Sequence, residues 1–120
     1  MNEVKKKDVE TVRELSTVEQ QLIENQVTEA IRTCYDPEIP VNIYEMGLIY
    51  GVTVGAQGQV SVVMTLTTPH CPAAQSLPKE VETKARSVPG VTGVEVKVVW
   101  EPSWNPSMMS EAAKLELGFM

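Results

Sequence analysis

The sequence has few of the residues that build disulfide scaffolds or metal-binding ribbons. Its 120 residues include two cysteines and one histidine, and the cysteines do not stand in a CxxC spacing. Two cysteines cannot form a disulfide scaffold, although a single bridge between Cys34 and Cys71 stays open at this stage. The absence of CxxC excludes a zinc ribbon and a thioredoxin-like redox site.

Basic residues and long apolar runs are also scarce. Ten basic residues against sixteen acidic ones give a formal net charge of −6, which argues against nucleic acid as a partner because phosphate contacts depend on Lys and Arg. No run approaches the ~20 apolar residues that span a bilayer, and the N-terminal residues lack the apolar stretch of a signal peptide. We therefore expect a cytoplasmic protein without a membrane partner.

The composition that remains is that of one globular domain. Hydrophobic residues make up 42% of the chain and charged residues 22%, which are ordinary proportions for a folded protein. A chain of this length buries roughly two-thirds of its unfolded surface. Residues 1–15 are dense in charge and are expected to form a solvated arm or a frayed helical extension. Residues 16–120 are expected to form the domain.

Hydrophobic periodicity predicts the first helix. Ser16 and Glu19 have the spacing of a capping box, and apolar residues then follow at three- and four-residue intervals up to Cys34, which indicates one buried helix face. The helix is expected to end near Tyr35, because the residue before Pro37 is pushed out of helical dihedral angles.

The rest of the chain predicts three strands and two further helices. Residues 48–54 and 60–66 read as an antiparallel hairpin around Gly55 and Gly58, and 94–100 as a third strand with period-two alternation. A helix that Pro78 is expected to kink or divide lies between the second and third strands. The tail holds a short helix from about 108 to 117. The order is α-β-β-α-β, an α/β (α+β two-layer) fold with a three-stranded sheet, helices on one face and a C-terminal helical tail.

Cys71 is the strongest candidate for chemistry. Pro72 suits the first position of a helix, so Cys71 would lie at the N-terminus, where the helix dipole lowers a thiol pKa. Thr67 and Thr68 offer hydroxyls to the same loop. The alternative is a buried cysteine that acts as a small hydrophobic residue.

Other polar candidates have ordinary structural explanations beside the functional ones. His70 adjoins Cys71 and is either a solvent-exposed loop residue or a weak metal ligand. Asp36 and Glu38 are either paired carboxylates or turn and cap residues. Cys34 lies on the apolar helix face and is expected to be structural.

Large apolar residues in the tail also allow two interpretations. Trp104, Met108 and Met109 are packing anchors, or they form an interaction surface beside the neighbouring prolines.

Three segments together resemble a known family. DPEIPVNIYEMGLIY at 36–50, MTLTTPHCP at 64–72 and EPSWNPSMMSEAAKLELG at 101–118 are similar to the SufT-like iron–sulfur cluster assembly family, the domain of unknown function 59. The resemblance covers about residues 17–118. It implies an iron–sulfur assembly domain fold and a site formed by Asp36, Glu38, Thr67, Thr68 and Cys71, with His70 as an accessory and Cys71 as the candidate metal ligand.

The function that this resemblance implies is an accessory one. We expect a non-enzymatic factor in iron–sulfur cluster assembly or transfer, which helps to mature client apoproteins through a reactive loop cysteine. It would bind no cofactor tightly, handle iron or a cluster transiently, and work with the assembly machinery or as a homodimer. The alternatives are a thiol-dependent enzyme that uses Cys71 and a pure protein-interaction module.

Overall fold

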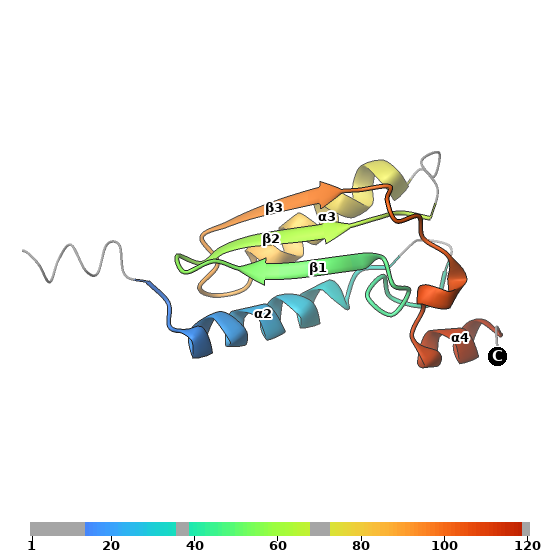
Figure 1. Cartoon of the computed structure of the whole chain (residues 1–120), viewed down its shortest axis with the longest axis horizontal. Coiled ribbons are helices and arrows are strands. Elements are labelled where there is room, and N and C mark those ends of the chain that lie inside the picture. Colours follow the sequence, from blue (N-terminus) through green and yellow to red (C-terminus); the bar gives the residue numbers. More distant parts are fainter. Residues whose placement is uncertain (1–13, 36–38, 68–72, 119–120) are drawn as a thin grey trace, which may run out of the picture.

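The computed structural model describes residues 14–35, 39–67 and 73–118. The elements, in chain order, are α2 (Thr17–Ile31), β1 (Ile49–Val54), β2 (Gln59–Met64), α3 (Ala73–Arg86), β3 (Gly93–Val98), the 3-10 helix η1 (Pro106–Met108) and α4 (Glu111–Leu117). The strands form one sheet in the order β1-β2-β3, in which β1 and β2 are antiparallel and β2 and β3 are parallel. The predicted α-β-β-α-β order, the hairpin and the helical tail are confirmed (Figure 1).

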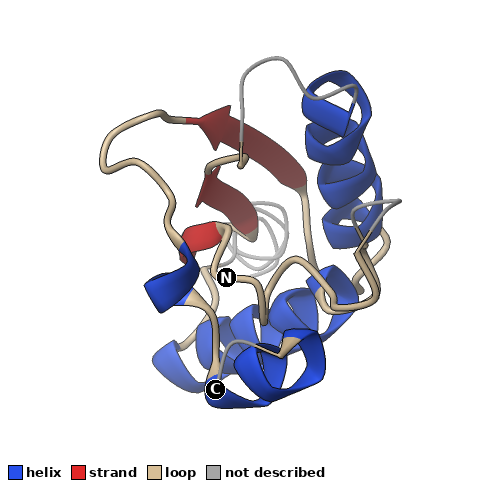
Figure 2. Ribbon diagram, turned by 90° about the vertical axis from the view of Figure 1, so that its right-hand side faces the viewer, coloured by secondary structure: helices blue, strands red, loops and turns tan. Residues whose placement is uncertain are grey.

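The two long helices cover one face of the sheet, as the sequence predicted (Figure 2). The buried side chains of β2 alternate along the strand and point toward α2 and α3: Val60, Val62 and Met64. Val62 pairs with Val52 on one side and with Val96 on the other, so all three strands contribute to the same core. Alternation with a period of two is what places this apolar set on a single face.

The predicted capping box starts α2. The Ser16 hydroxyl accepts from the Glu19 N–H at 3.1 Å, and the Glu19 carboxylate accepts from the Ser16 N–H at 2.8 Å. Just before it, Leu15 donates its N–H to the carbonyl of Ala56 at 2.6 Å. The helix ends at Ile31 rather than near Tyr35, because the chain tightens into a turn whose N–H groups bond three residues back.

The structure narrows one expectation about the helices and corrects another. Helix α3 is one uninterrupted element with Pro78 inside it, so the expected division at Pro78 is wrong, and the alternative of a kink stays a prediction. Proline removes one hydrogen bond from the ladder, and the remaining bonds suffice here. In the tail, the α-helix begins after the N-cap Ser110 instead of near Met108, which belongs to η1. Its predicted end near residue 117 is confirmed, and Gly118 caps it with a left-handed φ of 78°.

The third strand is shorter than the alternation suggested. β3 ends at Val98, and Trp100 is 43% exposed instead of continuing the strand. Among the helices described in the structure, none is long and apolar enough to span a membrane.

Candidate functional site

Only one of the predicted site residues falls within the part of the chain that the structure describes. Thr67 is exposed and lies just beyond the end of β2. Asp36, Glu38, Thr68 and Cys71, together with His70, lie outside the described residues. The grouping of these side chains into one site therefore stays a prediction.

The described residues that flank these positions lie at the same end of the sheet (Figure 1). Thr65, after β2, donates its N–H to the carbonyl of Leu48, before β1, at 2.8 Å. Ile43 donates its N–H to the carbonyl of Cys34 at 2.9 Å, which ties the turn before β1 to the end of α2. Backbone hydrogen bonds thus tie one flank of each predicted site loop to the segment 43–48 before β1.

Thr67 lies on the wall of a pocket of about 430 Å³. The end of β2 forms one wall, and the segment that follows β3 forms the other. The lining residues are Thr65, Leu66, Thr67, Trp100, Glu101, Ser103 and Trp104. This volume lies within the range of ordinary ligand pockets.

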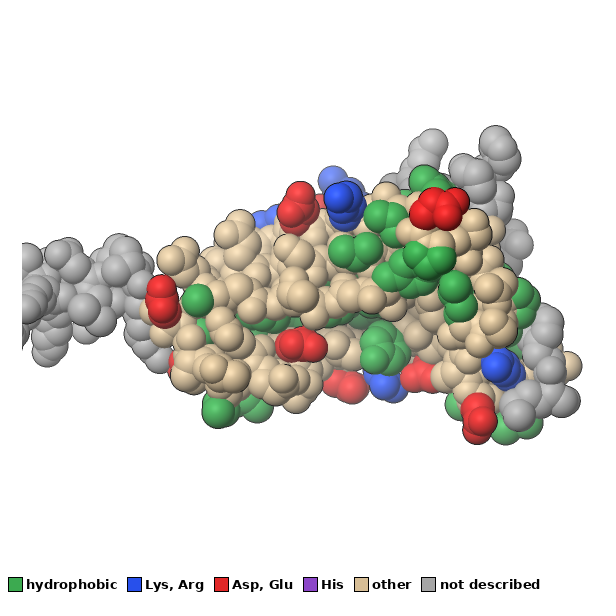
Figure 3. Space-filling view, in the orientation of Figure 1, with side chains coloured by type: hydrophobic (Ala, Val, Ile, Leu, Met, Phe, Trp, Pro, Cys, Tyr) green, Lys and Arg blue, Asp and Glu red, His purple; other side chains and the backbone are tan. Residues whose placement is uncertain are grey.

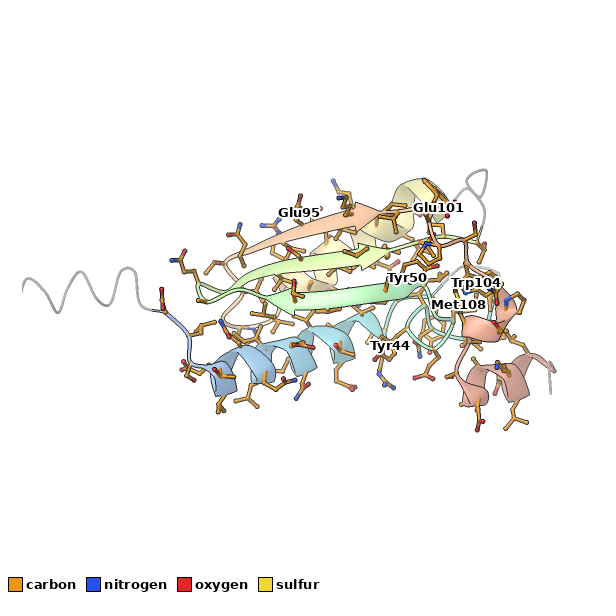
Figure 4. All side chains as sticks on the ribbon, viewed as in Figure 1. Tyr44, Tyr50, Glu95, Glu101, Trp104 and Met108 are labelled. Atoms are coloured by element: carbon orange, nitrogen blue, oxygen red, sulfur yellow. The ribbon has the colours of Figure 1, made fainter. Side chains whose placement is uncertain are left out.

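Hydrogen bonds fix the segment after β3 across the strand ends. Tyr50 of β1 donates its hydroxyl to the carbonyl of Pro102 at 2.7 Å, and the Met108 sulfur lies 3.6 Å from the same hydroxyl. The Trp104 indole donates Nε1–H to the carbonyl of Met46 at 2.8 Å. Figure 4 shows Tyr50, Trp104 and Met108 close together beside the start of β1.

These contacts bear on both interpretations of the tail. Met109 is buried and Trp104 packs against the core, so the prediction of packing anchors is confirmed for both. Trp104 also lines the pocket, so part of its ring is available for contact with a ligand or partner.

Cys34 is a core residue, as the sequence predicted. Its side chain is fully buried and is not in a disulfide. Burial, together with the nearby carboxylate of Glu80, raises the pKa of the Cys34 thiol to about 11, while the Lys84 ammonium lowers it by a smaller amount. A thiol that stays protonated is a poor nucleophile and a poor metal ligand at neutral pH.

The pocket itself was not predicted from the sequence. Thr65, Trp100, Glu101 and Ser103 appear in no periodic pattern that marks a site, and the alternation even assigned Trp100 to a strand. The available signal was an aromatic residue followed at once by an acidic one and a proline, a combination that ends a strand and exposes a ring. In the described parts of the chain, no three His, Cys, Asp or Glu residues gather closely enough to hold a metal ion.

Comparison with known proteins gives the chain its relatives. The family model for the iron-sulfur cluster assembly protein matches residues 24–98. An Fe-S protein maturation auxiliary factor of Porphyromonas gingivalis is 56% identical over 97 residues, which cover 81% of this chain and 92% of that protein. The Fe-S protein maturation auxiliary factor SufT of Staphylococcus aureus is 40% identical over 83 residues, covering 69% and 94%.

A solved structure agrees with these matches. The crystal structure of a domain of unknown function, DUF59, from Bacillus anthracis superposes with a TM-score of 0.80 at 34% sequence identity, covering 88% of this chain and all of that one. Both the predicted fold and the resemblance to the SufT-like family are confirmed. On its sequence and its fold, the chain belongs to the family of iron–sulfur cluster assembly proteins.

Proposed function

We propose that this chain is a non-enzymatic accessory factor in iron–sulfur cluster assembly or transfer, which helps to mature client apoproteins through Cys71. The proposal is supported by relatives that are named Fe-S protein maturation auxiliary factors and that match over most of their own length. The iron or cluster is cargo in this role, not a resident cofactor.

The observation that carries the proposal is the burial of Cys34. A [2Fe–2S] cluster ordinarily takes four protein ligands, most often thiolates. The chain has two cysteines, and Cys34 is fully buried with a raised thiol pKa, which leaves Cys71 as the only thiolate candidate. A cluster on one chain is therefore completed by external ligands, such as a second subunit's Cys71, a partner protein or a small thiol. Cargo held in this way is easily released.

We propose that Asp36, Glu38, Thr67, Thr68 and Cys71 form one site around this cargo. The hydrogen bonds from Thr65 to Leu48 and from Ile43 to Cys34 support the arrangement, because they bring the flanks of both loops to one end of the sheet. Carboxylates and hydroxyls are harder ligands than thiolates, so their role would be to bind iron weakly or to orient Cys71, with His70 as an accessory.

The setting follows from the same reasoning. We propose that the chain acts in the cytoplasm, with the iron–sulfur assembly machinery and client apoproteins as partners and a homodimer as one way to complete the ligand set. Neither nucleic acid nor a membrane is proposed as a partner, in keeping with the net charge of −6.

Anaerobic reconstitution with iron and sulfide, followed by gel filtration, tests this function. The wild-type monomer should retain no full cluster without added thiol, whereas with thiol it should hold a labile cluster and pass it to an apo-ferredoxin. Cys71→Ser should lose transfer, and Cys34→Ala, the matched control, should keep it. A monomer that holds a full cluster without thiol, or a Cys71→Ser variant that transfers normally, would contradict the proposal.

A further inference from the structure

The pocket beside Thr67 is selective in its charge. Among the described residues that line it, none is Lys, Arg or His, and Glu101 is the one with a charge. The chain as a whole carries a net charge of −6, so its long-range field also attracts cations and repels anions. An anionic ligand would gain no ion pair from these described residues and would face repulsion from Glu101.

The side chains that line the pocket also suit a cation. Two indole rings line it, those of Trp100 and Trp104, and Trp100 is 43% exposed. Tryptophan is the aromatic side chain that attracts a cation most strongly over its face. Hydroxyl groups from Thr67 and Ser103 add hydrogen-bond acceptors on either side.

We propose that this pocket binds an arginine side chain of a partner protein. A guanidinium is planar, stacks on an indole, and carries five N–H donors that match a carboxylate and hydroxyl acceptors. It is also more weakly hydrated than the ammonium of lysine, so less hydration is lost when it enters a half-apolar pocket. The carboxylate of Glu101 would pair with it at the pocket's open side.

The hydroxyl group of Thr65, in the wall of the pocket, is available as a further hydrogen-bond acceptor. Thr65 is fully buried, and among the described residues its Oγ1 has no hydrogen-bond partner. Burying a hydroxyl without a partner is costly, and such groups are uncommon in folded proteins. Because Thr65 also lines the pocket, a donor that enters the pocket and reaches this hydroxyl would give it a partner.

The surroundings of the pocket fit a protein partner better than a small free cation. Hydrophobic side chains gather over the same end of the sheet, and both acidic and basic side chains lie along its upper edge (Figure 3). Tyr44 is 37% exposed and lies below Tyr50 in Figure 4. An apolar patch with a charged rim would contact the residues that flank a docked arginine.

Both tryptophans of the chain line this pocket, so intrinsic fluorescence reports on it without a label. The probe is the blocked peptide acetyl-Gly-Arg-Gly-amide, titrated into the full chain in the absence of iron. One side chain of this size should bind with a dissociation constant on the order of 1–10 mM. The lysine peptide should bind about threefold more weakly, and the citrulline peptide, which keeps the shape but not the charge, at least tenfold more weakly.

Variants locate the binding. Glu101→Gln should weaken the arginine peptide about threefold and reduce the salt dependence. The matched control is Glu95→Gln, since Glu95 is an exposed glutamate of β3 that does not line the pocket and should leave binding unchanged. Trp100→Leu should also weaken binding, and Trp104 then remains as the reporter.

Three results would overturn the proposal: equal binding of the arginine and citrulline peptides, tighter binding of a phenylalanine or glutamate peptide, or equal losses for Glu101→Gln and Glu95→Gln. Because the titration uses no iron, its outcome is independent of the proposed role in cluster assembly. If cluster transfer fails, the binding of the arginine peptide is unaffected. If the arginine peptide does not bind, the proposed role in cluster assembly is unaffected.

Discussion

At the scale of single residues, the two cysteines are expected to differ sharply in reactivity. Cys34 is fully buried and its thiol pKa is raised to about 11, whereas Cys71 is predicted at a helix N-terminus that favours the thiolate. Iodoacetamide at neutral pH should therefore modify Cys71 much faster than Cys34. Peptide mapping by mass spectrometry measures both rates in one sample, and equal rates in the folded chain would contradict the helix-terminus argument.

Cys34 should also make stability depend on pH. Its folded pKa of about 11 exceeds the ordinary value of 9.0, so the folded state retains the proton more strongly than the unfolded state. This contribution to stability is fully present below pH 9 and is lost as the pH rises toward 11. By pH 11 the loss amounts to about 2 kcal/mol of unfolding free energy.

Comparison with a Cys34→Ala variant isolates this effect from the titration of lysines and tyrosines. Urea unfolding from pH 8 to 11 should give a steeper loss of stability in the wild type than in the variant. Parallel curves would mean that Cys34 ionises as easily in the folded chain as in the unfolded one.

The unpartnered hydroxyl of Thr65 predicts a substitution that stabilises the fold. Thr65→Val keeps the shape of the side chain and removes a fully buried Oγ1 that has no hydrogen-bond partner among the described residues. The free energy of unfolding should rise by about 1 kcal/mol. Thr53→Val, at an exposed position of β1, serves as the control and should change stability by less than about 0.5 kcal/mol.

At the scale of elements, the docking of the tail depends on one glycine in the turn before β1. Gly47 has a φ of 84°, and a Cβ there would overlap the backbone carbonyl of Met108. Gly47→Ala should therefore displace η1 and destabilise the chain by at least about 1–3 kcal/mol. Thermal unfolding and the indole signal of Trp104 would both report the change.

Gly51→Ala is the matched control for that experiment. Gly51 has no positive φ, and a Cβ there meets nothing within 4 Å. Its substitution should leave the tail in place and the stability nearly unchanged. Equal losses in the two variants would show that the close approach of Met108 does not require glycine.

Elements with local or periodic signals could be predicted from the sequence, and the pocket could not. Ser16 and Glu19 are three residues apart, and their capping box needs no knowledge of the fold. The bonds from Tyr50 to Pro102 and from Trp104 to Met46 join residues 52 and 58 positions apart. Nothing in a linear pattern encodes such a pairing, because it depends on where the strands end in space.

The candidate site could be predicted from the sequence only in part. Its residues were found through a family resemblance and the helix-terminus argument for Cys71, and the structure places Thr67 at the pocket. The burial of Cys34 was predictable because a helix face repeats every three to four residues. The raised pKa of the Cys34 thiol could not be predicted in this way, because it depends on the surrounding core and on the nearby Glu80 and Lys84.

At the scale of the whole molecule, the mixed pairing of the sheet sets an order of folding. β1 and β2 are antiparallel neighbours joined by a short turn, whereas the parallel pairing of β2 with β3 requires the chain from 65 to 92 to cross first. Local pairings form faster than those that must close a long loop. Pulsed hydrogen exchange during refolding should therefore protect the amides of β1 before those of β3.

The position of Cys71 within that crossing has a consequence for biosynthesis. On a ribosome, α2 and the hairpin emerge and can pack while β3 has yet to be made. The connection that contains Cys71 is closed only when β3 joins the sheet. If Cys71 handles the cargo as proposed, a newly made chain would acquire that capacity only after α2 and the hairpin have formed.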